Sequence, residues 1–333
     1  MSELYILLFV VVILALIFDY INGFHDTANA VAASISTRAI PPKQAIIMAA
    51  CLNFVGALYS TGVAKTVAQD IINIEAATSQ VMIAALLGAI SWNLITWYFG
   101  IPSSSSHAII GGVMGAGIAK AGISILKISG VKKIILALIC SPLIGLGLGF
   151  IIMTILYHFF KNKSPKRINN LFRRLQILSA AFLAFNHGSN DAQKSMGIIT
   201  MALVAAGVQS NVEVPLWVKI ACGLAIALGT AAGGWRIIHT LGGKIFKIEP
   251  INGFAIDLSS SLVIWTATAF PGLHLPVSTT HVVSGSIMGV GSAKRISAVR
   301  WGVAQQMLTA WVLTIPCTAT ISALFYYLTS LIF

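Results

Sequence analysis

The sequence predicts an all-α polytopic membrane protein built from two inverted-topology repeats, with broken helices and two helical hairpins that either span or re-enter the membrane. Three observations predict it: a strongly apolar composition, motifs that occur once in each half, and alternating loop charge. Of the 333 residues, 57% are hydrophobic and only 9% are charged. Because about a quarter of the residues in a soluble domain are charged, most of this surface is expected to face lipid.

Apolar runs such as 4–18, 81–99 and 134–160 predict the membrane segments. A helix needs about 20 apolar residues to cross roughly 30 Å of hydrocarbon. In lipid the backbone must satisfy its own hydrogen bonds, so these runs are expected to be helices, and strand-like alternation is absent. The first run follows Ser2 and Glu3 rather than a basic stretch, which indicates a retained helix and not a signal peptide.

Two motifs occur once in each half of the chain. Residues 22–30 and 187–195 share a glycine and an aspartate at one offset. Pro-Ser-Ser-Ser-Ser-His at 102–107 matches Pro-Val-Ser-Thr-Thr-His at 276–281, and the match continues without gaps as far as Lys120 and Lys294. Matches that keep their order in the chain indicate an internal duplication.

The duplication predicts three regions: a first repeat at 1–160, a basic cytoplasmic linker at 161–174 and a second repeat at 175–333. The net charge of +12 lies mostly in short loops, which favours the positive-inside rule over nucleic-acid binding. With basic loops inside, each half has five passes and the N-terminus lies outside. Because five is odd, the two halves are inverted relative to each other. The lysines between 120 and 133 fall outside in this scheme, which conflicts with the positive-inside rule. The expected passes are 4–37, 43–65, 80–99, 103–121 and 131–160, then 175–206, 216–236, 254–271, 276–292 and 300–331.

The serine motifs are predicted to start helices and to bind an oxyanion. Proline suits the first helical turn and Ser or Thr suits the N-cap, while a helix N-terminus offers free N–H groups and a positive dipole end. If the hairpins at 80–121 and 254–292 are re-entrant, their tips meet and surround a tetrahedral anion. Ordinary capping and helix packing are the alternative. The candidate phosphate ligands in these motifs are Ser104, Ser105, Ser106, Ser278, Thr279 and Thr280.

The aspartate motifs are predicted to bind a cation. Asp26 and Asp191 lie among apolar flanks, and intramembrane carboxylates mark ion or substrate pathways. Carboxylate, amide and hydroxyl oxygens suit a hard cation such as sodium, although a carboxylate can also carry a proton. Segments 4–37 and 175–206 exceed one crossing, so a broken or bent helix is expected at each motif. The cation candidates are Asp26, Asp191, Asn22, Asn29 and Asn186, and the phosphate set is extended by Thr27, Asn190 and Gln193.

The remaining groups near the motifs leave alternatives open. Lys194 stands where the first motif has Asn29, and it can neutralise an aspartate, contact the anion or face solvent. The histidines beside the motifs are interpreted as helix-holding groups rather than transition-metal ligands. The glycines at 111–117 and 285–291 are expected to let helices pack closely. No GxxxxGK[ST] motif is present, so ATP is not the expected energy source.

The motifs at 22–30, 187–195, 102–107 and 276–281 resemble the signatures of the inorganic phosphate transporter (Pit) family, in a compact prokaryotic form without a long central insert. The resemblance implies a non-enzymatic secondary importer of phosphate in the cell membrane, coupled to sodium or protons, with sodium favoured. It also implies a homodimer, lipid contact and no organic cofactor. The expected mechanism is alternating access around a midplane site at the repeat interface. The alternatives are another oxyanion such as sulfate, a metal–phosphate complex, a passive anion channel or a membrane-embedded metalloenzyme.

Overall fold

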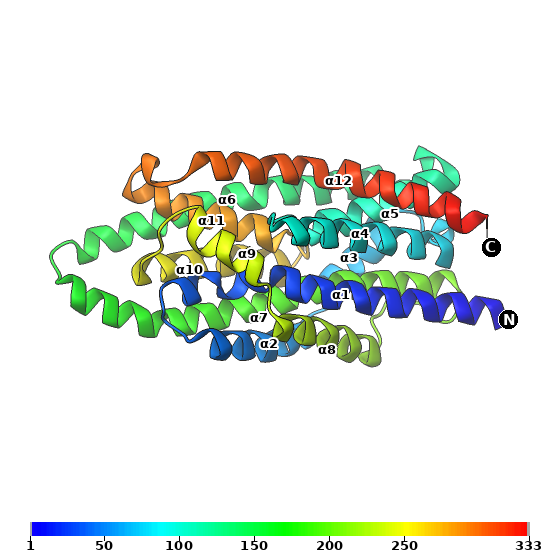
Figure 1. Cartoon of the computed structure of the whole chain (residues 1–333). Helices are drawn as coiled ribbons and strands as arrows, with labels where there is room; N and C mark the ends of the chain where they lie inside the picture. Colours follow the sequence, from blue (N-terminus) through cyan, green and yellow to red (C-terminus); the bar gives the residue numbers. More distant parts are fainter. Residues whose placement is uncertain (1, 332–333) are drawn as a thin grey trace.

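The computed structural model describes residues 2–331, and in this range the chain is a bundle of helices with no strand beyond one isolated bridge (Figure 1). The helices are α1 (Ser2–Ser36), α2 (Pro42–Tyr59), α3 (Gly62–Asp70), α4 (Ser79–Phe99), α5 (Ser105–Ala121), α6 (Ile128–Phe160), α7 (Pro165–Ala205), α8 (Leu216–Ala232), α9 (Trp235–His239), α10 (Pro250–Ala269), α11 (Thr279–Lys294) and α12 (Trp301–Ser330). Most boundaries lie within a few residues of the predicted passes, because apolar runs and capping residues determine both.

The same order of elements occurs twice. A long helix, a broken helix, a helical hairpin, a short 3₁₀ turn and a final long helix run from α1 to α6, and the same series runs from α7 to α12. The final helices carry an internal proline, Pro142 and Pro316, at the offset that also relates the two serine motifs. This order agrees with the duplication inferred from the motifs.

Broken helices are present, but not at the aspartate motifs where they were expected. α1 and α7 run through Asp26 and Asp191 without interruption. The bends lie between α2 and α3, at 67°, and between α8 and the segment Trp235–Lys244, at 62°. α1 is continuous through the motif, and the polar side chains there have partners on neighbouring helices or in the preceding turn; Thr27, for example, donates to Gly23 O over 2.5 Å.

The basic linker is shorter than expected. Only residues 161–164 separate α6 from α7, because α7 begins at Pro165 instead of near residue 175. Proline fits the first turn of a helix, and the lysine, arginine and leucine residues that follow are good helix formers. In Figure 1 this turn lies at one end of the bundle, while both termini lie at the other, so α1 and α7 run in opposite directions.

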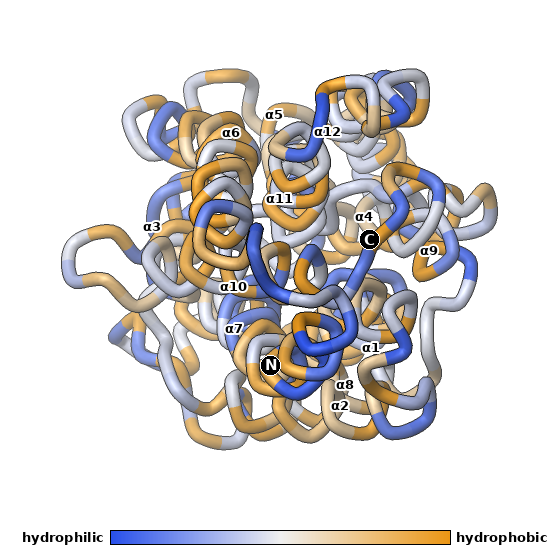
Figure 2. The backbone as a smooth tube through the Cα atoms, turned by 90° about the vertical axis from the view of Figure 1, so that its left-hand side faces the viewer, coloured by the Kyte–Doolittle hydropathy of each residue, from blue (hydrophilic) through white to orange (hydrophobic). Residues whose placement is uncertain are grey.

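The two halves are interleaved rather than side by side. α1 packs on α8 and α2 on α7, while α5 packs on α12 and α6 on α11. The glycines shared by the aspartate motifs explain the first two contacts: a Cβ at Gly23 would lie 2.4 Å from Ile226 O, and one at Gly188 would lie 2.2 Å from Asn53 O. Seen end-on in Figure 2, α7 and α11 lie inside the bundle, with α1, α2, α6, α8 and α12 around them.

The hairpins α4–α5 and α10–α11 bring their tips together inside the bundle. Ser106 Oγ donates to Val277 O over 2.8 Å, and the rings of His107 and His281 lie 4.5 Å apart between centroids. The expected close packing of the hairpin glycines is confirmed, because a Cβ at any of four of them would clash with α12 or α6 backbone or side chains. These glycines are Gly111 and Gly115 against α12, and Gly285 and Gly289 against α6.

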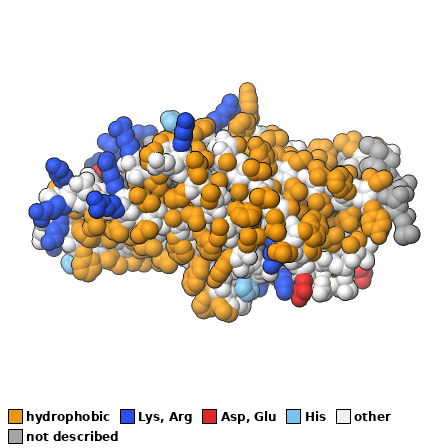
Figure 3. Space-filling view, turned by 90° about the horizontal axis from the view of Figure 1, so that it is seen from below, with side chains coloured by type: hydrophobic (Ala, Val, Ile, Leu, Met, Phe, Trp, Pro, Cys, Tyr) orange, Lys and Arg blue, Asp and Glu red, His pale blue; other side chains and the backbone are white. Residues whose placement is uncertain are grey.

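The outer surface suits a membrane. Within the described residues, four helices are long and apolar enough to cross a membrane, and up to six segments qualify if each bent pair is one span. Figure 3 shows broad apolar sides, with lysine and arginine side chains gathered toward the end of the molecule that carries the α6–α7 turn. The bundle is therefore a multi-pass membrane protein with polar groups buried inside it.

Candidate functional site

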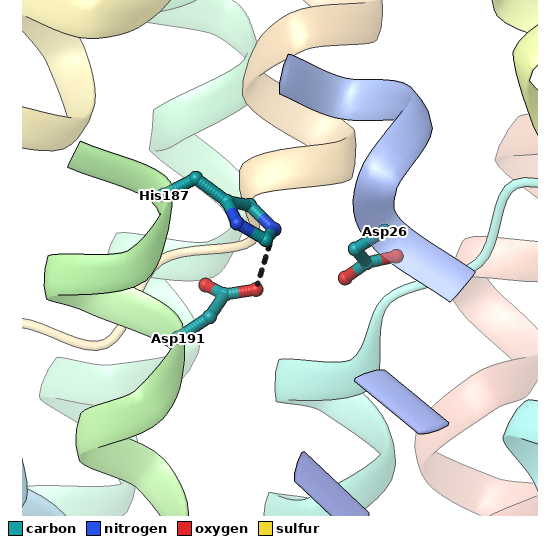
Figure 4. A group of neighbouring side chains, drawn as sticks. All are labelled: Asp26, His187 and Asp191. Atoms are coloured by element: carbon teal, nitrogen blue, oxygen red, sulfur yellow. Dashed lines mark ion pairs between the residues drawn. The ribbon is translucent and has the colours of Figure 1, made fainter. Parts of the chain in front are cut away.

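Asp26 on α1 and Asp191 on α7 face each other in the interior, together with His187, one turn before Asp191 on α7 (Figure 4). A ligand atom from each of the three lies within 4.8 Å of those of the other two. The exposed fractions of Asp26 and Asp191 are 2% and 0%. Crossing of the antiparallel α1 and α7 places the two motifs at the same depth, although 165 positions separate them in sequence.

Asp26 receives hydrogen bonds from both hairpins. Ser105 Oγ, at the start of α5, donates to Oδ2, and Thr280 Oγ1, at the start of α11, donates to Oδ1, each over 3.2 Å. His25 Nδ1 lies 2.7 Å from Oδ1 on the α1 side, and the other ring nitrogen is 3.2 Å from Thr96 Oγ1 of α4. These three neighbours satisfy the carboxylate oxygens inside the bundle.

Asp191 has a different set of neighbours. Lys194 Nζ donates to Oδ1 over 2.6 Å, and Thr279 Oγ1 donates to Oδ2 over 3.2 Å. His187 Nε2 lies 3.4 Å from the same Oδ2, and its Nδ1 is 3.1 Å from Asn53 Oδ1. Lys194 is fully buried, so this ion pair is completely enclosed by the bundle.

Asn29 connects the two carboxylates. Its Nδ2 donates to Thr280 Oγ1 over 2.9 Å and to Thr279 Oγ1 over 3.3 Å. Thr280 in turn donates to Asp26, and Thr279 donates to Asp191. Two adjacent hydroxyls of one hairpin tip therefore bond to the carboxylates of both halves.

Other hydroxyls of the serine motifs serve the hairpin tips themselves. Ser104 Oγ accepts from His107 N over 3.1 Å and Ser278 Oγ accepts from His281 N over 3.2 Å, so both are N-caps. Ser106 bonds the opposite tip, as described above. Ser105, Thr279 and Thr280 are thus the motif hydroxyls that face the aspartates.

The remaining predicted residues lie around this centre. Asn190 Nδ2 donates to Thr268 Oγ1 of α10 over 2.7 Å, and Gln193 Oε1 accepts from Ala64 N of α3 over 3.2 Å. Asn186 donates to Phe182 O in its own helix, over 2.9 Å. Thr27 bonds the preceding turn, and both side-chain polar atoms of Asn22 are buried without a partner among the described residues. None of these groups bonds directly to either carboxylate.

Sequence reasoning assigned no site role to His25 or His187 and left that of Lys194 open. Helical spacing was the available signal: His187 is four residues before Asp191 and Lys194 is three after it, so all three lie on one face of α7. His25 gave no such signal, because neighbouring residues on a helix point in different directions. Its position beside Asp26 depends on the local geometry of α1.

The geometry supports binding of small ions of both signs. Two buried carboxylates and an imidazole provide ligands for a cation, while the N-termini of α5 and α11 provide N–H groups and hydroxyls for an anion.

The sequence model of the phosphate transporter family matches residues 22–322, which includes both pairs of motifs. This chain belongs to the phosphate transporter family.

Known relatives of this phosphate transporter agree with the assignment. A protein of Bacillus subtilis strain 168, named "Probable low-affinity inorganic phosphate transporter", is 54% identical over the whole of both chains. A protein of Rhizobium meliloti strain 1021 with the same printed name is 47% identical over 96% of this chain and 95% of its own. A solved structure titled as the sodium-dependent phosphate transporter superposes with a TM-score of 0.87 at 27% identity, covering 98% of this transporter and 100% of that chain. The expected family and the expectation of a transporter rather than an enzyme are confirmed.

Proposed function

We propose that this transporter is a secondary active importer that carries inorganic phosphate across the cell membrane together with sodium. Asp26, Asp191 and neighbouring oxygens bind the cation, and the hydroxyls and helix N-termini of the two hairpin tips bind phosphate. The proposal rests chiefly on one observation: Thr279 and Thr280, adjacent on one tip, donate to Asp191 and Asp26 respectively.

This observation suggests how the two ions are coupled. While the carboxylates are free, they attract the hydroxyl protons of the tips and repel an anion. A sodium ion bound at this centre offsets the negative charge that Lys194 does not compensate, so the same hydroxyls can turn toward a phosphate oxygen. Phosphate binding then depends on prior cation binding, since an uncompensated anion near two carboxylates inside a membrane is strongly disfavoured.

Alternating access is supported by the paired hairpins. Each hairpin enters the bundle from its own side, and the tips meet at Ser106 and Val277. Movement of either tip away from the centre would open the site to one side of the membrane. We place the end with the α6–α7 turn in the cytoplasm and the N-terminus outside, because lysine and arginine gather at the former end (Figure 3). The halves are then inverted repeats; the homodimer is carried over from the family resemblance.

The test is uptake of labelled phosphate by purified protein in proteoliposomes. Inward gradients of sodium, of protons and of potassium are compared at equal membrane potential. Sodium-driven accumulation against a phosphate gradient is the expected result. Accumulation driven only by protons would show that the coupling ion is the proton and not sodium. No uptake under any gradient would refute the proposal. Sulfate as competitor, and uptake with and without magnesium, separate free phosphate from another oxyanion or a metal–phosphate complex.

A further inference from the structure

The two aspartate motifs differ at one position that lies directly at the site. Asn29 follows Asp26 by three residues, and Lys194 follows Asp191 by three residues, so both occupy the same place on their helices. Asn29 is neutral and offers an oxygen, whereas Lys194 carries an ammonium group and offers only donors. The duplication therefore puts a positive charge in one half where the other half has an amide.

The Lys194 ammonium lies against Asp191. Its Nζ is 2.6 Å from Asp191 Oδ1, and the exposed fraction of Lys194 is 0%. A buried ammonium group is strongly disfavoured unless a carboxylate compensates it. Among the described residues, Asp191 is the carboxylate that forms an ion pair with Lys194. The charge of Asp191 is therefore already offset by the protein.

Asp26 differs in both respects. No lysine or arginine of the described chain forms an ion pair with it, and its closest neighbours are His25 and two hydroxyls. Asn29 Oδ1 is buried and has no hydrogen-bond partner among the described residues, and the exposed fraction of Asn29 is 3%. The unpartnered amide oxygen of Asn29 and the carboxylate of Asp26, three residues apart on α1, together form a suitable pair of ligands for a cation.

We propose that Lys194 is a tethered cation that replaces one of two mobile cations, so that this transporter binds a single sodium ion, at Asp26 and Asn29. The inference rests on the function proposed above and divides its cation site: Asp191 binds the tethered ammonium, and Asp26 binds the sodium ion. Lys194 compensates Asp191 directly, whereas no lysine or arginine of the described chain forms an ion pair with Asp26. Asp26 is thus the carboxylate of this pair that lacks a tethered cation, and one sodium ion supplies it.

The tethered charge has a consequence for the driving force. With one sodium per phosphate, a tenfold sodium gradient contributes about tenfold to phosphate accumulation; with two, it would contribute about a hundredfold. A carrier with Lys194 thus uses less of the sodium gradient per phosphate, and it reaches a lower limiting accumulation.

The experiment counts sodium ions bound to purified full-length protein, without requiring transport. Thermal unfolding is followed as sodium chloride replaces choline chloride at constant ionic strength. Because a ligand that binds only the folded state stabilises it in proportion to the logarithm of its concentration, the limiting slope gives the number of bound ions. We expect a slope of one for the wild type, two for Lys194→Asn and zero for Asn29→Lys, with Lys194→Arg as the charge-matched control at one.

The inference is overturned by a wild-type slope of two, or by a folded Lys194→Asn variant that still binds one ion. If Lys194→Asn does not fold, the wild type and Asn29→Lys decide, since retained sodium stabilisation in Asn29→Lys also contradicts the scheme. Failure of the inference is distinguishable from failure of the proposed function. A wild-type slope of two with sodium-driven phosphate uptake overturns the single-sodium site but leaves the proposed function standing, whereas no uptake under any gradient overturns the proposed function.

Discussion

Thr280 of α11 donates its hydroxyl proton to Asp26 of α1 across 3.2 Å, although 254 positions separate them in the chain. The bond joins the tip of the second hairpin to the charged group of the first repeat. Asn29, one turn beyond Asp26, bonds the same hydroxyl from the other side at 2.9 Å. A change at this hydroxyl should therefore affect both the anion and the cation part of the site.

Replacement of Thr280 tests that connection. Thr280→Val keeps the shape but removes the donor to Asp26, and we expect the KM for phosphate to rise about tenfold, which corresponds to about 1.4 kcal/mol. Thr280→Ser keeps the hydroxyl and should stay within about threefold of the wild type. Initial uptake rates in proteoliposomes measure both variants. Equal KM values for the valine and serine variants would exclude this hydroxyl from phosphate binding.

Removal of either carboxylate charge should abolish coupled uptake. Asp26→Asn deletes the charge that attracts sodium, and Asp191→Asn leaves the ammonium of Lys194 without its partner, which is strongly disfavoured in a buried site. We expect each variant to lower sodium-driven uptake about a hundredfold or more. Full transport by both variants would contradict the assignment of the cation site.

Asp257 provides a matched control for these two variants. It is also buried, and its Oδ2 accepts from Ser179 over 3.2 Å, but Ser179 precedes Asp191 on α7 by twelve residues, roughly 18 Å along the helix. Asp257→Asn should therefore keep sodium-dependent uptake. If Asp257→Asn lost as much sodium-dependent uptake as Asp26→Asn, the effect of Asp26→Asn would be a general effect of removing a buried carboxylate and not evidence for a cation site.

The close helix crossings predict a strong effect of adding one methyl group. Gly23→Ala would place Cβ 2.4 Å from Ile226 O, and Gly188→Ala would place it 2.2 Å from Asn53 O. Each should lower stability by about 1–3 kcal/mol, because the backbones must separate. Gly147→Ala in α6, where nothing lies within 4 Å of the added Cβ, should be neutral or stabilising. Thermal unfolding of the three purified variants gives the comparison.

The proposed orientation predicts which positions a membrane-impermeant thiol reagent reaches in intact cells. In a background without the native cysteines, Ser124→Cys between α5 and α6 should be labelled from outside. Lys163→Cys between α6 and α7 should be labelled only after permeabilisation. Both positions are exposed. Labelling of Lys163→Cys in intact cells would show that the orientation is the reverse of the proposed one. The lysines near residue 127 favour that reverse orientation, because they lie outside in the proposed one.

Helix boundaries could be predicted because they depend on local sequence. The ungapped match from Pro102 to Lys120 with Pro276 to Lys294 located both hairpin tips, since proline and hydroxyl residues at a helix start act through the adjacent backbone. Apolar runs located the long helices in the same way. The bends after α2 and α8 were missed although Ser60-Thr61 and Gly233-Gly234 lie at them, because the apolar residues on both sides led to one predicted pass across each bend.

The interior of the site was only partly predictable. Asp26 and Asp191 were identified from their charge, but their partners Ser105, Thr279 and Thr280 come from other helices, and Ser104, Ser106 and Ser278 looked equivalent to them in sequence. Only the register of α5 and α11 decides which hydroxyls face the carboxylates. The placement of Lys194 similarly depends on tertiary packing, which encloses a residue that would face water on an isolated helix.

The interleaving of the halves has a consequence for biosynthesis. When the ribosome has completed α1 to α6, the glycine faces of α1 and α2 still lack α8 and α7, and the hairpin α4–α5 lacks α12. Asp26 then has Ser105 but not Thr280. Until the second half is made, the nascent first half therefore lies in the bilayer with a carboxylate that only part of its final hydrogen-bond partners surround.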